Sequence, residues 1–322
     1  MRDRARAVVI GGGVGGCAIV YWLARLGWDD VVLLERADLT SGSTFHSAGL
    51  VGQLRNSLSL TKMMMSSVDL YRALEEEVGL ETGWREVGSL RLASSEERMD
   101  EIARQAGWAK TFGLPLELVS PAEAQELFPP LAPEGVLGAA YLPTDGYVDP
   151  SQLTFALAEG ARQRGAEVST NTRVTGIRLE RGRVQAVETD RGEIETEIVV
   201  NAGGMYAFEI GALVGVNVPV LPMAHEYLIT KPSGLPTDMP TMRDPSLLVY
   251  FRPESGGLIM GGYERHCAPW SVDGIPADFN SRLLDEDWPR FEELLENAVL
   301  RVPELADMDA IRLINGPEAF TP

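Results

Sequence analysis

The chain has 322 residues, of which 45% are hydrophobic and 23% charged, a composition that excludes intrinsic disorder and collagen-like repeats and predicts two domains or one large interleaved fold. Its 47 acidic and 28 basic residues give a net charge of -19, which argues against nucleic acids and anionic membranes as partners. The two cysteines lie outside any CxxC pattern, so no structural metal site is expected. No apolar run reaches about 18 residues, so no membrane-spanning helix is expected either. The scarcity of cysteine and an N-terminus that leads directly into a strand suggest a cytoplasmic protein.

The first part of the chain has the pattern strand, glycine-rich loop, helix, strand. Residues 7–10 are a continuous apolar run, as expected of a buried parallel strand, and residues 11–16 are almost all glycine. Residues 17–27 predict a helix that ends at glycine, and residues 31–35 predict a second strand that ends in an acid. This order is typical of a dinucleotide-binding unit; the alternative is a glycine-rich turn in an unrelated α/β fold.

The loop has the spacing Gly11-x-Gly13-x-x-Gly16, in which each glycine has a separate purpose. Gly11 permits a tight turn, Gly13 lets the backbone approach a pyrophosphate, and Gly16 lets the helix pack closely on the strand. With Gly12 they form the predicted phosphate-binding loop, at a helix N-terminus whose dipole attracts anions. Glu35 is expected to accept hydrogen bonds from ribose hydroxyls, and a carboxylate at this position disfavours a 2′-phosphate and therefore NADP.

The residues after the second strand distinguish FAD from NAD. Glu35 and Arg36 lead into the run Gly42-Ser43-Thr44-Phe45-His46-Ser47-Ala48-Gly49-Leu50. This pattern resembles the D-amino-acid-oxidase-type flavoproteins and, within them, the dimethylglycine and sarcosine dehydrogenase branch, although Phe45 stands where the family usually has tryptophan. The resemblance implies FAD as the cofactor and implies that these motif residues contact it: Arg36, Gly42, Ser43, Thr44, His46, Gly49 and Leu50.

In this branch the histidine of the motif is joined covalently to the flavin ring. The resemblance therefore implies that His46 is the attachment site, and a neutral imidazole nitrogen is a competent nucleophile for such a bond. The alternative is that His46 is a loop histidine that hydrogen-bonds its own turn. The resemblance also implies that the backbone of Val174 reads the adenine edge and that the turn at Gly203 lies against the cofactor. From the sequence alone, Val174 is simply a strand valine.

The order of strands and helices predicts an α/β fold in which a Rossmann-like FAD/NAD(P)-binding domain is interleaved with an α+β substrate domain built on a mixed sheet. The expected FAD-binding parts are residues 1–78 and 144–216, and the expected substrate parts are residues 79–143 and 217–308. Residues 309–322 are expected to begin a return to the FAD-binding domain. In the family this segment leads into a further strand, a glycine-rich turn and a helix that cover the flavin, so the sequence reads as truncated there.

Three local predictions concern elements that frame these domains. A capping box from Ser94 to Glu97 is expected to open a helix that runs through residue 109. Residues 198–201 are expected to form a buried strand. Residues 284–301 are expected to form a helix with Trp288, Phe291 and Leu294 on its inward face.

Oxidation of an amine by a flavin removes a hydride from the carbon next to nitrogen, so the protein must orient that carbon and favour the neutral amine. His225 and Tyr250 are the candidates, because both lie on predicted strands of the sheet expected to face the flavin. Dimethylglycine-oxidising relatives carry a His-x-Tyr and a Tyr-x-Arg strand here, with the histidine and tyrosine at the active site. The alternatives are a hydrogen-bonded sheet histidine and a packing tyrosine. Arg252 is expected either to pair with a substrate carboxylate or to be solvated.

The resemblance implies FAD-dependent oxidation of an N-methylated glycine, dimethylglycine or sarcosine, to an iminium that is hydrolysed or passes its one-carbon unit to folate. Oxygen or an electron-transfer flavoprotein would reoxidise the flavin. Two alternatives stay open. One is an oxidase or dehydrogenase for another amino or hydroxy acid, and the other is a non-catalytic regulatory relative or an inert fragment.

Overall fold

The computed structural model describes residues 2–321. Four parallel strands near one end of the molecule form a sheet in the order β12-β1-β2-β8. They are β1 (Ala7–Ile10), β2 (Val31–Leu34), β8 (Glu167–Ser169) and β12 (Ile198–Asn201). The two apolar runs predicted at the N-terminus are thus neighbouring strands, and every residue in both is buried, as expected for a parallel sheet covered on both faces.

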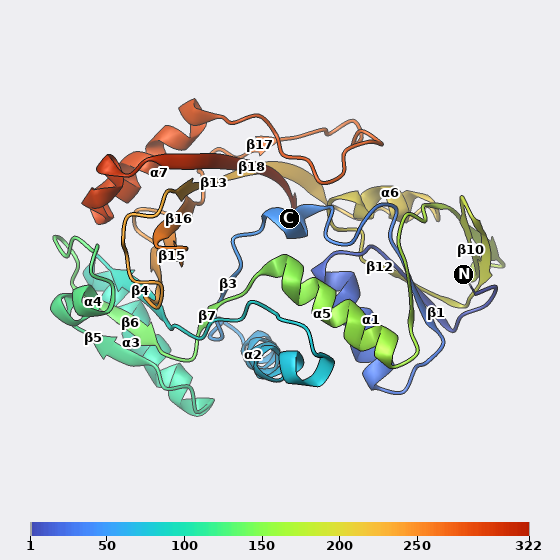
Figure 1. The fold of residues 1–322 in the computed structure, drawn as a ribbon, viewed down its shortest axis with the longest axis horizontal. Helices are drawn as coiled ribbons and strands as arrows, with labels where there is room; N and C mark the ends of the chain where they lie inside the picture. Colours follow the sequence, from blue (N-terminus) through green and yellow to red (C-terminus); the bar gives the residue numbers. More distant parts are fainter. Residues whose placement is uncertain (1, 322) are drawn as a thin grey trace.

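Successive residues of β1 point to opposite faces of this sheet, and each face has its own core. Val9 belongs to a core that it shares with three helices, which Figure 1 shows on the same side of the sheet: α1 (Val14–Arg25), α2 (Leu58–Val78) and α5 (Pro150–Gln163). Val8 packs instead toward a three-stranded meander: β9 (Val174–Glu180), β10 (Arg183–Thr189) and β11 (Gly192–Glu195). The alternation of side chains along one strand therefore places helices on one face and the meander on the other.

The other large element is a nine-stranded sheet. It is mixed because β14 pairs with β4 in parallel, whereas β14 with β15 and β4 with β6 are antiparallel. Its strands are β4 (Ser89–Ala93), β5 (Glu117–Val119), β6 (Gly138–Leu142), β13 (Leu221–Thr230), β14 (Thr241–Asp244), β15 (Val249–Glu254), β16 (Gly257–Gly262), β17 (Ala268–Pro269) and β18 (Ala310–Phe320). With the parallel sheet it confirms the expected α/β class.

Helices and short connections complete the fold. In Figure 1, α3 (Glu96–Thr111), α4 (Pro121–Leu127) and α7 (Trp288–Arg301) lie at the mixed-sheet end of the molecule. The short elements are β3 (Leu50–Val51), which pairs with β7 (Gly146–Tyr147), α6 (Ala207–Ala212), and the 3-10 helices η1 (Ser43–His46), η2 (Gly204–Tyr206) and η3 (Pro303–Asp307). Among residues 2–321, no helix is both long enough and apolar enough to cross a membrane.

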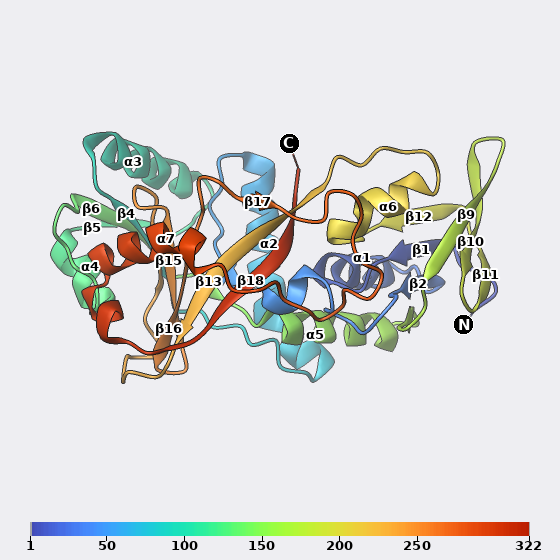
Figure 2. The same ribbon diagram turned by 90° about the horizontal axis from the view of Figure 1, so that it is seen from above.

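Two long strands connect the two ends of the molecule. β13 and β18 form an antiparallel ladder that pairs Leu221 with Phe320 at one end and Thr230 with Ala310 at the other. Figure 2 shows this ribbon running from the mixed sheet to the middle of the molecule. The expectation that residues 309–322 begin a return to the FAD-binding domain stays a prediction; the hydrogen bonds of β18 itself go to β13 of the mixed sheet.

The end of β18 nevertheless reaches the N-terminal part of the chain. The Ser43 hydroxyl in η1 donates a hydrogen bond to the Pro317 carbonyl at 2.7 Å. In Figure 1 the C-terminal mark lies beside the blue segment that carries η1. The ladder thus brings the described end of β18 against the motif predicted to contact the flavin.

Three local predictions differ from the structure. α3 begins one residue later than expected, because Ser95 rather than Ser94 caps the helix by accepting the Arg98 N–H. β12 is not fully buried, since it is an edge strand with β1 on one side only, and Ile198 is 40% exposed. α7 begins only at Trp288, which lies in the first turn and is 40% exposed, whereas Phe291 further along the helix is buried as predicted.

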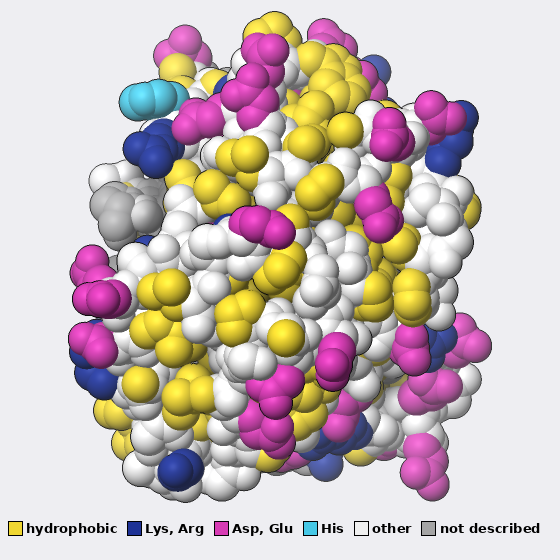
Figure 3. All heavy atoms as spheres, turned by 90° about the vertical axis from the view of Figure 1, so that its left-hand side faces the viewer, with side chains coloured by type: hydrophobic (Ala, Val, Ile, Leu, Met, Phe, Trp, Pro, Cys, Tyr) yellow, Lys and Arg dark blue, Asp and Glu magenta, His cyan; other side chains and the backbone are white. Residues whose placement is uncertain are grey.

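Negative charge is spread over the outer surface of the mixed-sheet end. Figure 3 shows this face, on which acidic side chains are scattered among hydrophobic ones. The composition of this surface agrees with the net charge of -19 for the whole chain.

Candidate functional site

The glycine loop between β1 and α1 has the tight geometry that its spacing predicts. Gly11 has a φ of +119°, and a Cβ there would collide with the Ala202 carbonyl after β12. A Cβ on Gly16 would collide with the Gly11 carbonyl, so only glycine lets α1 pack this closely. Gly13 precedes α1 without a side-chain cap, and the first turn contains no acid. The positive end of α1 is therefore open to an anion.

Two side chains hold this loop. Glu35, directly after β2, accepts the Gly12 N–H at 2.6 Å and the Ala37 N–H at 2.9 Å. Thr44 in η1 accepts the Val14 N–H of α1 at 3.1 Å. A carboxylate has about four acceptor positions, so Glu35 retains capacity for the ribose hydroxyls expected from the sequence.

A cavity of about 560 Å³ opens beside the loop. Ten residues predicted to contact the cofactor line it: Gly11, Gly12, Gly13, Glu35, Arg36, Gly42, Ser43, Thr44, Val174 and Gly203. Gly16 does not line the cavity, because it is packed between α1 and β1. Four segments that are far apart in the sequence therefore line one cavity: the glycine loop, the motif after β2, the start of β9 and the turn after β12.

Arg36 forms a rigid part of the cavity wall. Its guanidinium lies 3.8 Å from the centre of the Tyr206 ring and donates to the Phe279 carbonyl at 3.1 Å. The Tyr206 hydroxyl donates to the same carbonyl at 2.6 Å. Burial raises the pKa of Tyr206 to about 12, so its hydroxyl stays a donor. The loop around Phe279 was missed by sequence reasoning, since nothing in its composition marks it as part of a cofactor site.

His46 lies at the end of η1 and is 5% exposed. Its imidazole fits against the backbone of Gly316 in β18, where any Cβ would collide with the ring. The Nε2 atom is buried and has no hydrogen-bond partner among the described residues. Burial lowers the pKa of His46 to about 4, so the ring is neutral near pH 7. A buried, neutral imidazole with one unpaired nitrogen is an unusual arrangement that calls for a partner outside the chain.

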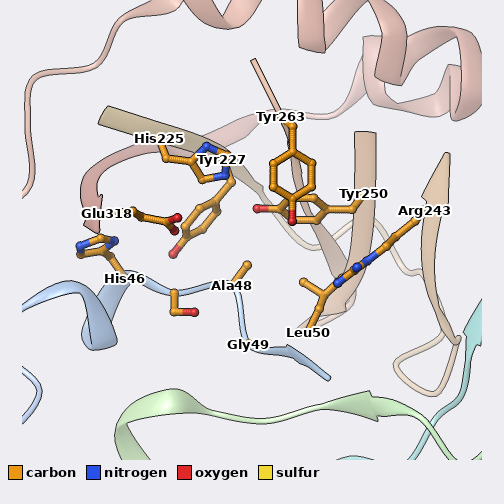
Figure 4. A pocket seen from close by; sticks show the side chains of 11 residues that line it. His46, Ala48, Gly49, Leu50, His225, Tyr227, Arg243, Tyr250, Tyr263 and Glu318 are labelled. Carbon is orange, nitrogen blue, oxygen red and sulfur yellow. The ribbon is translucent and has the colours of Figure 1, made fainter. Parts of the chain in front are cut away.

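A second, smaller cavity of about 150 Å³ begins where η1 ends. Figure 4 shows its lining, which comprises residues 46–50, His225, Tyr227, Arg243, Tyr250, Tyr263 and Glu318. His46, Gly49 and Leu50, predicted to contact the cofactor, lie here rather than in the larger cavity. The structure therefore brings the predicted attachment histidine together with both predicted catalytic residues, His225 and Tyr250.

Six lining residues were not predicted as site residues from the sequence: Ser47, Ala48, Tyr227, Arg243, Tyr263 and Glu318. A signal existed for Tyr227, because residues two apart on a strand share a face and His225 lies on the same strand. No comparable signal marked Glu318, since its place depends on the pairing of β18 with a strand almost one hundred residues earlier.

His225 is held by a carboxylate. Its Nδ1 lies 2.9 Å from Oε2 of Glu264, whose other oxygen accepts the Glu226 N–H at 3.2 Å. Burial alone would lower the pKa of His225, but the hydrogen bond and charge of Glu264 outweigh burial, and the pKa is raised. The same pairing lowers the pKa of Glu264 against the opposing effect of burial. His225 is therefore a titratable group in the pocket that keeps a proton more readily than a free histidine.

Two tyrosines of the pocket, Tyr227 and Tyr250, are held neutral by burial. Burial raises the pKa of Tyr227 to about 12 and raises that of Tyr250 further. Tyr250 packs over Gly261 of β16, where a Cβ would collide with its phenol ring. Its ring centre lies 6.3 Å from that of Tyr263. These rings give the pocket apolar walls with hydroxyl groups that donate or accept hydrogen bonds.

Arg252 matches neither of its two expected environments. It is buried, donates to the Ala48 carbonyl at 2.9 Å, and forms an ion pair with Glu254. Its guanidinium also lies 4.6 Å from the centre of the Tyr147 ring. Arg252 therefore holds the loop after η1 through the Ala48 carbonyl, and its guanidinium is not free to bind a substrate carboxylate.

Comparison with known proteins decides the family. The profile of the FAD dependent oxidoreductases matches residues 6–319. The chain belongs to this family. The human mitochondrial sarcosine dehydrogenase is 41% identical over 99% of the chain, and the rat mitochondrial dimethylglycine dehydrogenase is 37% identical over 100% of it. The chain spans 35% and 38% of the lengths of these two relatives.

Solved structures agree on the fold of this flavoprotein-family member. The L-proline dehydrogenase from P. horikoshii superposes with a TM-score of 0.89 at 30% identity, covering 100% of this chain and 83% of that one. The similarity covers the whole chain and therefore includes both the parallel and the mixed sheet.

The residues present fit FAD. The glycine loop and the open end of α1 suit a pyrophosphate, and Glu35 suits a ribose. The larger cavity has room for a dinucleotide portion and leads along η1 to the smaller pocket. The buried, unpaired Nε2 of His46 is an orphaned polar atom at that junction. The roles of the individual lining residues stay predictions.

The close packing at Gly16 can be tested by substitution within one helix. Gly16→Ala is expected to lower the free energy of unfolding by about 1–3 kcal/mol, because the new Cβ collides with the Gly11 carbonyl and pushes α1 from the sheet. Gly15→Ala is the matched control, since a Cβ there meets nothing within 4 Å. Urea denaturation should show the loss only for Gly16→Ala; equal effects would contradict the packing argument.

Proposed function

We propose that the chain binds FAD in the larger cavity and oxidises an N-methylated glycine, dimethylglycine or sarcosine, in the smaller pocket. The observation that carries this proposal is the geometry of η1. Its first residues line the larger cavity and its last residue, His46, lines the smaller one beside His225 and Tyr250. The names of the two relatives support the choice of substrate, because both act on N-methylated glycines by those names.

FAD, when bound, accepts a hydride from the carbon next to the substrate nitrogen. The chain's residues prepare the amine for that loss. An amine that carries an extra proton has no lone pair to stabilise the developing iminium, so its proton must leave first. His225 takes up this proton when its ring is neutral, and Tyr227, Tyr250 and Tyr263 enclose the carbon and exclude water. The iminium is then hydrolysed or passes its one-carbon unit to folate.

We further propose that His46 holds FAD covalently. The bond would join Nε2 to a methyl carbon of the flavin ring. One proton would leave from that methyl and one from the imidazole, and dioxygen would accept the two electrons released. The neutral state of His46 supports the proposal, because only an imidazole nitrogen with a free lone pair can form the bond.

Substrate oxidation is tested by adding sarcosine or dimethylglycine anaerobically to the FAD-loaded protein. The oxidised flavin absorbance band is expected to bleach with one of the two, and the better substrate identifies the activity. Admitting air then separates rapid reoxidation by oxygen from a need for an electron-transfer protein. A flavin that binds but stays oxidised with both would overturn the substrate assignment and favour another amino acid or a regulatory role.

Covalent attachment is tested without activity. The wild-type chain is expected to keep flavin fluorescence on a denaturing gel, whereas His46→Ala is expected to lose it completely, because no other nitrogen replaces Nε2. His266→Ala is the matched control, since His266 is an exposed histidine outside both cavities. Fluorescence that persists in His46→Ala would refute attachment at this residue.

The proton-accepting role of His225 predicts a pH dependence. The charged or titratable groups acting on it are Glu264, Glu318, Arg290 and His46. Only neutral His225 accepts a proton, so flavin reduction should rise as pH passes upward through its raised pKa. Glu264→Gln removes the charge that raises this pKa, so the acid limb should move to lower pH. The measurement is the rate of anaerobic flavin reduction between pH 5 and 9 in both proteins. If the acid limb of the profile does not move in Glu264→Gln, the limb belongs to a group other than His225.

A further inference from the structure

The smaller pocket carries opposite charges on opposite sides. We propose that Glu318 binds the substrate ammonium and Arg243 binds the substrate carboxylate, so that the pocket accepts a small zwitterion in one orientation. This inference rests on the proposed function and names the groups that select the substrate. Figure 4 shows Glu318 beside His46 on one side of the pocket and Arg243 on the other, with the tyrosine rings between them.

Glu318 is a half-buried acidic residue of the pocket that has no cationic partner among the described residues. It extends from β18 into the pocket, and its charge acts on both His225 and Tyr250. Among residues 2–321, no Lys, Arg or His nitrogen lies within 4.0 Å of its carboxylate. A half-buried carboxylate without a cation favours a positively charged ligand. The ligand's ammonium would then lie beside His225, the group proposed to take its proton.

Arg243 is the corresponding cation. It extends from β14, and no carboxylate of the described residues lies within 4.0 Å of its guanidinium. Neighbouring Arg55 is also cationic, and burial together with the charge of Arg243 lowers the pKa of Arg55. The two buried arginines, Arg252 and Arg301, each pair with a carboxylate, whereas Arg243 is exposed and lines the pocket without one. An unpaired guanidinium in a pocket is suited to a carboxylate, which it can bind through two parallel hydrogen bonds.

The space between the two charges limits the ligand. The pocket has a volume of about 150 Å³, which suits an amino acid with a short side chain. Tyr227, Tyr250 and Tyr263 form its walls, and their ring faces suit the methyl groups of a methylated ammonium. The charges therefore set the direction of the ligand, with its nitrogen toward His46 and its carboxylate toward Arg243.

The test measures binding rather than turnover, using three small probes that resist amine oxidation. Trimethylglycine carries both charges, its carboxamide carries only the cation, and methoxyacetate carries only the anion. Dissociation constants are measured on the FAD-loaded protein by calorimetry or by the shift in flavin absorbance. Because no oxidation is needed, the result is independent of whether sarcosine or dimethylglycine reduces the flavin.

Each variant should lose affinity for two of the three probes. Arg243→Gln is expected to raise the dissociation constants of trimethylglycine and methoxyacetate about three- to tenfold and to leave that of the carboxamide unchanged. The effect is modest because Arg243 is exposed and its charge is partly screened. Glu318→Gln is expected to raise the dissociation constants of trimethylglycine and the carboxamide about tenfold and to leave that of methoxyacetate unchanged. Arg243→Lys should restore part of the affinity, because it keeps the charge without the planar fork.

Arg55→Gln is the matched control, since Arg55 lies next to Arg243 but does not line the pocket. It should change all three constants by less than about twofold. Equal losses for all three probes in Arg243→Gln or Glu318→Gln would show a structural effect and overturn the assignment. Wild-type protein that binds none of the probes, or binds them equally well in every variant, would also overturn it.

Discussion

The ladder between β13 and β18 is the constraint on which the candidate site depends. Its register pairs His225 with Gly316 and Met223 with Glu318, so the catalytic candidate and the unpaired acid enter one pocket from adjacent strands. Gly316 has no side chain, and only for this reason can the imidazole of His46 lie against the strand. A shift of one residue would turn Glu318 to the other face and put a side chain where His46 lies.

η1 couples this ladder to the parallel sheet. Thr44 supports the first turn of α1, Ser43 bonds the carbonyl of Pro317, and His46 closes the smaller pocket. One turn of 3-10 helix thus contacts the element that suits a pyrophosphate and the strand that carries the acid. Because η1 lines both cavities, a group that fills the larger one would reach the smaller one along this turn, and we propose that the two are parts of one site.

Sequence reasoning succeeded where the signal is local. Strand, glycine loop, helix and acid follow one another within thirty residues, and Gly11 and Gly16 are required by contacts inside that unit. No local signal indicated the pairing of β18 with β13, because the two strands are far apart in the sequence. Pro317 is accepted in β18 because this strand pairs with β13 alone among the described strands, so its other edge is open and a missing N–H is tolerated. Arg243 and Glu318 could not be predicted as a pair, since their approach depends on the whole order of the mixed sheet.

Because the whole chain is strongly negative, the attraction of a substrate carboxylate depends on the charges inside the pocket, Arg243 and Glu318. A net charge of -19 would repel a free carboxylate at long range, but physiological salt screens charges beyond about 8 Å. Within that distance the field at one side of the pocket comes from Arg243, which has no carboxylate within 4.0 Å among residues 2–321. On the other side it comes from Glu318. An anion without an ammonium gains only one of these interactions and meets the acid, so the same pair that attracts a zwitterion disfavours simple acids.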